Sequence, residues 1–396
     1  MQNRVLKQVF RALPLVIGPL VLLAIFFFTD LSFEDQAYQA KVLKVEPDAK
    51  AIHVELESQK ARTLPLKAVP AALEAKDPQA LVGTNVKVYQ EGILTKISRL
   101  GVVWALAIVG LTLLALVIQA QRLRMLYSCG AHHAKWWHAF RALLIGLLYG
   151  NVLPAGQVGG DPIKAFYLAK LTEGKRSHAL AAVMIDRALG LAVLAALAVG
   201  AIVLGAVEIS DPRLRFLIIA ALSAGLLATA ALLSSKLRRG LGLSAIAKFL
   251  PAKTLREKVS SALKEVSASP LVLGMAVVYS ALAHLALISA VYLVALALHS
   301  PVGFGEFVAK VPVANIVASL PLAPPGGWGF GEWAYMLLFF ALGAETSFMF
   351  SAIPRLAMLF VSLFGALASW HLPAKPSGDT VILEAPALKE GEASNG

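Results

Sequence analysis

Long apolar runs separated by short polar stretches make up most of the chain after residue 100. Five of them have the length of a membrane-spanning helix: 101–119, 178–205, 214–234, 270–296 and 347–371. A helix needs roughly 20 apolar residues to cross about 30 Å of hydrocarbon. An earlier run, Leu13–Phe28, reaches this length with its flanks, and no convincing cleavage site follows it closely. The pattern therefore predicts about six spanning helices, the first of them an uncleaved signal anchor.

Two further apolar regions, 139–171 and 306–343, are each interrupted in the middle. The interruptions read NVLPAGQVGGDPIK, residues 151–164, and ASLPLAPPGGWGFGE, residues 318–332. In both, a proline (Pro154 or Pro321) stands five residues before a glycine pair, and a carboxylate follows. The halves on either side hold about 14 residues or fewer, which is too short to span a bilayer. Each region is therefore predicted to be a re-entrant helical hairpin.

Residues 30–99 alternate apolar and polar side chains instead. The stretch AKVLKVEPDAKAIHVEL predicts a β-hairpin around the turn PDAK, and NVKVYQEGILTKI repeats the alternation around Glu91 and Gly92. We expect a small β-rich insert here, with a simple spacer as the alternative. Residues 253–268 place apolar side chains on one helical face, which indicates a helix on the cytoplasmic membrane surface. The polar residues 373–396 are predicted to be a disordered tail.

Composition and charge assign sides to these elements. The chain is 58% hydrophobic and only 15% charged, whereas charged residues make up about a quarter of a soluble protein. Its net charge of +12 comes from basic residues before the first run, after the second (Arg122 and its neighbours) and between residues 236 and 264. Such a distribution follows the positive-inside rule and excludes a nucleic-acid partner.

The resulting scheme is an all-α polytopic protein of the bacterial inner membrane with both termini in the cytoplasm. Residues 1–29 form the signal anchor, 30–99 the extracytoplasmic insert, 100–372 the transmembrane domain and 373–396 the tail. Counting spans along the chain, the first hairpin enters from the cytoplasm and the second from outside. The two hairpins are therefore opposed.

The interrupted segments also carry the candidate chemistry. Non-helical backbone inside a bilayer is tolerated only where protein or a water-filled cavity covers it. The glycine pairs permit positive φ and close approach, and helix starts at the tips favour a bound phosphate. Asp161 is followed 26 residues later by Arg187, and Glu332 is followed 23 residues later by Arg355. A hairpin with a carboxylate and then a span with an arginine thus occurs twice, which is typical of an inverted repeat with a central site.

The candidate substrate-binding residues come from both interruptions and the spans that follow them. They are Asn151, Gly159, Gly160, Asp161, Lys164, Asp186, Arg187, Gly326, Gly327, Glu332 and Arg355. In one interpretation, the two arginines bind a lipid phosphate and the carboxylates serve as counter-charges or proton carriers. In the other, the charges form structural ion pairs between helices. Lys164 could pair with Asp161 or reach a headgroup.

Three stretches resemble a known family when taken in order: GNVLPAGQVGGDPIKAFYLAK, SHALAAVMIDRALGL and PPGGWGFGEWAYMLLFFALG. Over roughly residues 100–372 the chain is similar to the flippase-like family built on the transmembrane domain of lysylphosphatidylglycerol synthase. This resemblance implies a protein that moves lipids or lipid-linked groups between leaflets. The family usually has arginine where Lys164 and Gly331 stand here, and it commonly has a short loop in place of the insert.

Other functions stay open at this point. A membrane enzyme could use Asp161 or Glu332 as a base on a polyprenyl-phosphate or phospholipid headgroup, and an assembly factor could recruit an envelope protein through residues 30–99. No nucleotide-binding motif is present, so we expect a passive or ion-coupled transporter rather than an enzyme, with no cofactor and no metal. The histidines beside Trp136 and Trp137 are more simply part of an interfacial anchor, and His284 suits a hydrogen bond between helices. The oligomeric state is not predicted.

Overall fold

A computed structural model describes most of the chain. The described residues are 32–46, 51–56, 61–65, 69, 71, 77–129, 133–153, 156–205, 212–233, 261, 264–265, 269–320 and 324–370. The predicted signal anchor, most of the predicted surface helix, the tail, Pro154 and Pro321 lie outside these residues.

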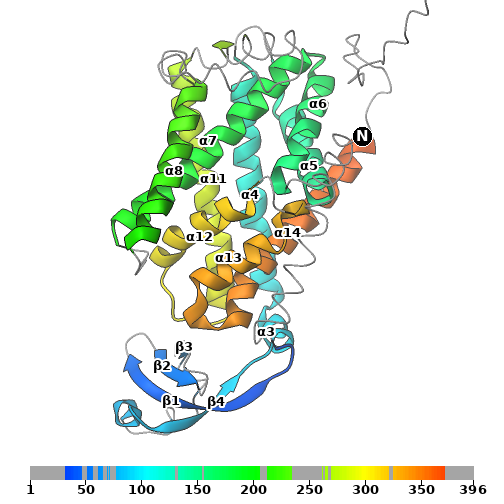
Figure 1. Cartoon of the computed structure of the whole chain (residues 1–396). Coiled ribbons are helices and arrows are strands. Elements are labelled where there is room, and N and C mark those ends of the chain that lie inside the picture. The colour runs from blue at the N-terminus through cyan, green and yellow to red at the C-terminus, as the bar shows by residue number, and fades with distance from the viewer. Residues whose placement is uncertain are drawn as a thin grey trace, which may run out of the picture.

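The described chain is a bundle of helices with a small sheet at one end (Figure 1). The helices are α4 Val102–Tyr127, α5 Trp136–Val152, α6 Asp161–Thr172, α7 Arg176–Val203, α8 Pro212–Leu233, α11 Pro270–Ala297, α12 Phe304–Ala318, α13 Phe330–Leu338 and α14 Ala344–Trp370. Within the described residues, α4, α7, α11 and the part of α14 up to Leu367 are long and apolar enough to cross a membrane. These helices make the chain a multi-pass membrane protein. The predicted span 214–234 forms α8, whose apolar stretch is shorter, Ile218–Leu227, so the total of six spans stays a prediction.

The sheet forms from the alternating segment, as predicted. Its strands are β1 Gln36–Glu46, β2 Ala51–Leu56, β3 Ala61–Pro65 and β4 Asn85–Gln90, antiparallel in the order β3-β2-β1-β4. Glu46 pairs with Ala51 across the turn PDAK, which confirms that hairpin. One face is buried through Val42, Ile52 and Val88.

The predicted repeat of the strand pattern beyond Glu91 is wrong. Residues after Gly92 form a short helix, α3 Ile93–Arg99. The Asp35 carboxylate accepts the Gly92 N–H at 2.8 Å, so the chain leaves the sheet at this glycine. This hydrogen bond favours the ionised carboxylate and lowers the pKa of Asp35 below its usual value.

The sheet and α3 lie against the start of α14 and the turn that joins α13 to it. The Ser32 N–H donates to Oε1 of the buried Glu345 at 3.1 Å, and Lys96 Nζ donates to Thr346 Oγ1 at 3.0 Å. Strand β3 also contacts η6, Phe340–Leu342, within the same turn. The insert is therefore attached to the second interrupted region of the chain.

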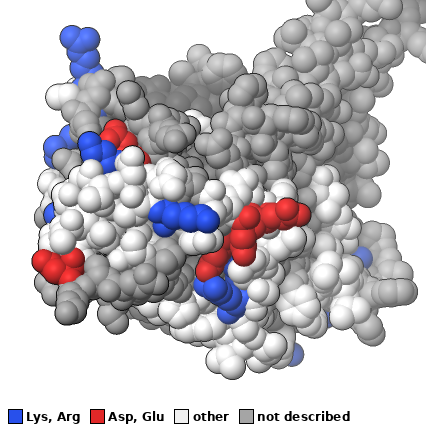
Figure 2. All heavy atoms as spheres, turned by 90° about the horizontal axis from the view of Figure 1, so that it is seen from below, with Lys and Arg blue, Asp and Glu red and all other residues white. Residues whose placement is uncertain are grey.

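Seen from the sheet end, acidic and basic side chains lie close together among a majority of uncharged ones (Figure 2). The described part of this face shows no patch of a single sign. The net positive charge of the chain is therefore not concentrated there, and this face gives no support for a polyanionic partner.

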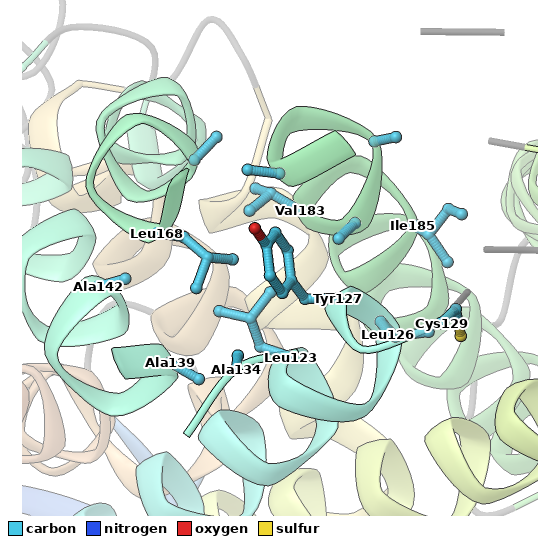
Figure 3. Packing of buried hydrophobic residues seen from close by; sticks show 14 of the residues in the cluster. Leu123, Leu126, Tyr127, Cys129, Ala134, Ala139, Ala142, Leu168, Val183 and Ile185 are labelled. Atoms are coloured by element: carbon cyan, nitrogen blue, oxygen red, sulfur yellow. The ribbon is translucent and has the colours of Figure 1, made fainter. Parts of the chain in front are cut away.

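One core of the bundle surrounds Tyr127 at the end of α4 (Figure 3). Leu123, Leu168 and Val183, from α4, α6 and α7, are fully or almost fully buried around it. The Tyr127 hydroxyl lies 2.6 Å from Thr172 Oγ1, which satisfies its polar end. Because lipid tails are as apolar as leucine, such close packing rather than hydrophobic burial holds the helices together.

Glycine allows the first interrupted segment to lie directly on α5. A Cβ on Gly160 would overlap the carbonyl oxygen of Gly146, and a Cβ on Gly146 would lie 2.6 Å from Lys164 Cβ. The backbone of Gly160 is right-handed, with φ −81°. The expectation of positive φ at this first pair is therefore wrong, and close approach is the reason for glycine here.

We expect Gly160→Ala to lower the free energy of unfolding by about 1–3 kcal/mol, as overpacking does elsewhere. The matched control is Gly200→Ala in α7, where an added Cβ meets nothing within 4 Å. Helix propensity alone predicts a gain of roughly 0.5–1 kcal/mol for the control. Thermal unfolding of both variants in detergent measures the difference, and equal melting temperatures would contradict the assigned contact.

Candidate functional site

The two interruptions meet inside the bundle. Short helix pairs flank them: α5 and α6 surround η3, Gly156–Gly160, while α12 and α13 surround η5, Pro325–Gly327. These four helices have 17, 12, 15 and 9 residues, below the roughly 20 that span a bilayer. The turn η5 lies against both η3 and α5. Residues that the sequence places 167 positions apart thus become neighbours.

The second glycine pair adopts the backbone that only glycine favours. Gly326 has φ +65° and Gly327 has φ +76°, which confirms the expected positive φ at this tip. A Cβ on Gly326 would also lie 2.7 Å from Asn151 Oδ1. Asn151, from the first interruption, therefore packs against the second tip, and its amide donates to Leu147 O at 3.0 Å.

Five charged side chains form a first group near η3. They are Arg122 on α4, Asp161 and Lys164 on α6, and Asp186 and Arg187 on α7. Arg122 Nε lies 2.7 Å from Asp186 Oδ1, and Lys164 Nζ lies 3.4 Å from the other oxygen of that carboxylate. Lys164 Nζ is also 3.0 Å from Asp161 Oδ1. Lys164 thus pairs with both carboxylates.

Arg122 is fixed by contacts to two further helices. Its Nη1 donates to Ser280 Oγ at 2.6 Å, and the serine hydroxyl donates to Ala276 O at 2.7 Å on α11. Gly190 on α7 lies beside the guanidinium, and a Cβ there would be in ordinary van der Waals contact with Nη1 at 3.4 Å. His284 Nε2 lies 3.0 Å from Gly190 O, which confirms its predicted hydrogen bond between helices.

Arg187 differs from the other members of the first group. Its Nε and Nη2 atoms are buried and make no hydrogen bond to any residue that the structure describes. Its nearest carboxylate oxygen, Asp161 Oδ2, lies 3.9 Å from Nε, too far for a hydrogen bond. The side chain is 25% exposed. The guanidinium therefore has two donors without an acceptor among the described residues.

A second charged group joins η5 to α13 and α14. Glu332 is completely buried, its Oε2 accepts the Gly329 N–H at 2.6 Å, and its Oε1 accepts Ser351 Oγ at 2.9 Å. Arg355 Nε lies 3.1 Å from the same Oε1, and Arg355 Nη1 donates to Gly326 O at 2.7 Å. This group is electrically neutral, and each of its carboxylate oxygens has a partner.

Gly331 explains how Arg355 reaches this position. A Cβ on Gly331 would overlap Arg355 Nη2. The residue that departs from the sequence pattern of the resembled family thus makes room for the arginine of the next helix.

The structure sorts the eleven predicted site residues into three places. Asp161, Lys164, Asp186 and Arg187 form the first group, and Glu332 and Arg355 belong to the second. The remaining five, Asn151, Gly159, Gly160, Gly326 and Gly327, lie in or beside the two turns between the groups. Both charges of the second group are paired, whereas in the first group Arg187 stays 3.9 Å from its nearest carboxylate oxygen. Within the described chain no group of three or more metal-ligating side chains occurs.

Sequence reasoning missed three members of these groups: Arg122, Ser280 and Ser351. The sequence places Arg122 only in the basic flank of a span, and the structure shows in addition that it is buried against Asp186. No sequence signal distinguishes Arg122 from Arg124, the basic residue two positions later. Ser351, in contrast, lies one turn before Arg355, and this spacing could have identified it.

We expect Glu332→Gln to destabilise the protein, because the largely buried Arg355, 14% exposed, would lose its counter-charge. Breaking a buried ion pair from one side costs about 3–5 kcal/mol. The control is Glu306→Gln, whose 45% exposed side chain pairs with Lys310, and exposed pairs contribute about 0–1 kcal/mol. Chemical or thermal unfolding in detergent distinguishes the two. A loss no larger for Glu332→Gln than for the control would contradict the role assigned to Glu332.

Comparison with known proteins identifies the family of the chain. The family described as "Lysylphosphatidylglycerol synthase TM region" matches residues 84–365. The match begins earlier than the expected residue 100 and includes β4 and α3. The UPF0104 membrane protein MJ1595 of Methanocaldococcus jannaschii is 30% identical over 83 residues, which cover 21% of this chain and 25% of the relative. The matched part is thus about a quarter of that relative's length. No solved structure matches.

Both charged groups and both glycine turns lie inside the matched range 84–365. The chain therefore belongs to the family of the lysylphosphatidylglycerol synthase transmembrane region, and it is a multi-pass membrane protein of that family.

Proposed function

We propose that this protein moves a lipid with an anionic phosphate headgroup from one leaflet to the other. The observation that carries the proposal is Arg187, whose buried Nε and Nη2 donors have no hydrogen-bond partner among the described residues. A buried donor left unsatisfied costs about 1–3 kcal/mol. The planar guanidinium matches the oxygens of a phosphate, so a bound headgroup would supply the missing acceptors.

The arrangement of the short helices supports transport. Two interrupted regions, each with a carboxylate and a following arginine, have their tips in contact. In the proposed topology they are re-entrant hairpins entering from opposite sides of a bacterial inner membrane, with both termini in the cytoplasm. Inverted repeats of this kind alternate access by moving one half against the other around a central site.

The two arginines differ in a way that suits two access states. Arg355 is held by Glu332 and Gly326 O, while Arg187 stands 3.9 Å from Asp161. In our mechanism, Arg187 receives the phosphate in the present state and closes onto Asp161 when the phosphate leaves. Arg355 is released from its partners in the opposite state and takes part there.

An enzymatic function is less well supported. Both oxygens of Glu332 and one of Asp161 already accept close contacts from basic or N–H and O–H groups. A general base needs a free oxygen within hydrogen-bond reach of the proton it removes. Glu332 thus suits a counter-charge role better than base catalysis, and the vesicle experiment below tests Asp161, whose Oδ2 makes no close contact to a described residue.

A second role, recognition of an envelope protein by residues 30–99, is favoured by one contact. Glu345, in the first turn of α14, accepts the Ser32 N–H. A partner bound to the insert would act on the hairpin that carries Glu332. In this role, partner binding to the insert would modulate lipid transport, and transport would remain the main function.

The test is lipid transfer in reconstituted vesicles. With a fluorescent anionic phospholipid in both leaflets and a quencher added outside, the wild type should expose inner-leaflet lipid. Arg187→Gln should reduce the rate about 10–100-fold, since hydrogen bonds to a charged group contribute about 1.5–3 kcal/mol. Lys175→Gln, at the exposed N-cap cation of the same helix, is the control.

Mass spectrometry of the same vesicles separates transfer from catalysis. An unchanged lipid that has changed leaflet supports the transporter, whereas a chemically altered headgroup supports the enzyme. If the wild type transfers an anionic lipid and Arg187→Gln transfers it equally well, the proposed site is wrong.

A further inference from the structure

The five charges of the first group alternate in sign along a chain of contacts. The order is Arg122, Asp186, Lys164, Asp161 and Arg187, and the successive distances are 2.7, 3.4, 3.0 and 3.9 Å. Three cations and two anions leave one positive charge that no described member of the group compensates. The second group, with Glu332 and Arg355, adds none.

The surplus positive charge lies at the Arg187 end. At the other end Arg122 is buried, makes the shortest contact and is capped by Ser280. Lys164 is buried as well and lies between both carboxylates. Only Arg187 combines the longest contact with buried donors that lack acceptors in the described chain.

A purely structural role for Arg187 fits these distances poorly. A guanidinium that served only to hold Asp161 would approach it to about 2.7–2.9 Å, the usual length of a charge-assisted hydrogen bond. The Asp161 carboxylate instead lies closer to Lys164, at 3.0 Å, than to Arg187, at 3.9 Å. The Arg187 guanidinium can therefore pair with a further anion.

We propose that this alternating chain sets the charge of the ligand at one. A singly charged phosphate ester neutralises the group, whereas a doubly charged one would leave a net negative charge where charges are poorly solvated. The site therefore takes a phosphodiester headgroup and takes a phosphomonoester only after it has gained a proton. This inference rests on the proposed function and identifies the substrate class within it.

Arg122 acts in this scheme as a positioning residue. It does not touch the ligand. It pairs with Asp186, so that Lys164 is able to contact Asp161 as well as Asp186. Without Arg122, Lys164 would be drawn to Asp186, and Asp161 would turn to Arg187 as its remaining cation. The binding site for the anion would then be filled by the protein's own carboxylate.

The test compares two labelled lipids in vesicles that hold the full-length protein. One is phosphatidylglycerol, a phosphodiester with one charge at every pH used. The other is phosphatidic acid, whose phosphomonoester loses its second proton near pH 6. We expect transfer of phosphatidylglycerol to change little between pH 5 and pH 8. Transfer of phosphatidic acid should be at least about tenfold faster at pH 5, where most of it is singly charged.

Two substitutions change the charge in opposite directions. Asp161→Asn raises the surplus to two, so transfer of phosphatidic acid at pH 8 should rise about tenfold relative to phosphatidylglycerol. Arg122→Gln lowers the surplus to zero and should reduce transfer of both lipids about tenfold. Arg122→Lys should restore transfer, which a merely structural loss at this position would not predict. Melting temperatures identify any variant that fails to fold. If Arg122→Gln does not fold, the selectivity of Asp161→Asn still tests the charge rule.

The outcomes separate this inference from the proposed function. Equal transfer of both lipids at both pH values would overturn the charge rule and leave lipid transport standing. Unchanged selectivity in a folded Asp161→Asn protein would also overturn it. Transfer of neither lipid would overturn both. Uptake of water-soluble glycerophosphoglycerol in place of lipid transfer would keep the charge rule and overturn the lipid substrate.

Discussion

The structure depends on one constraint: inside a bilayer, every charge and every backbone polar group needs a partner within the protein. The two interrupted segments satisfy it together, since η5 lies against η3 and α5. Their charges satisfy it through neighbouring helices, because Asp186 finds Arg122 on α4 and Glu332 finds Arg355 on α14. Arg187 stands out among these charges because two of its buried donors have no acceptor in the described chain.

Much of this arrangement could be predicted from the sequence, but the pairing could not. Proline and glycine pairs followed by carboxylates indicate where helices break, and strand alternation around PDAK indicates the hairpin. The partner of Asp186 is 64 residues away on α4, and finding it requires the rotation of each helix about its axis. Helices that are apolar on all sides, because lipid covers what neighbours do not, carry no periodicity that reveals that rotation. The helix α3 was missed for a related reason, since its start depends on Asp35, 57 residues before Gly92.

The likeness of the two halves hides a chemical difference. In the second half one carboxylate and one arginine complete each other with the help of Ser351 and backbone groups. In the first half an additional arginine from α4 upsets the balance and leaves Arg187 incompletely paired. The two halves therefore share a sequence pattern but differ in how completely their charges are paired.

The contact between Ser32 and Glu345 also bears on how the protein is made. These residues are 313 positions apart, so the contact can form only after almost the whole chain has been synthesised. The four strands are complete by Gln90, and domains generally fold in the order in which they leave the ribosome. The sheet is thus ready long before the α13–α14 turn arrives. Burial of Glu345 against the start of the insert is then one of the last steps of assembly, and it joins the beginning of the described chain to its final helix.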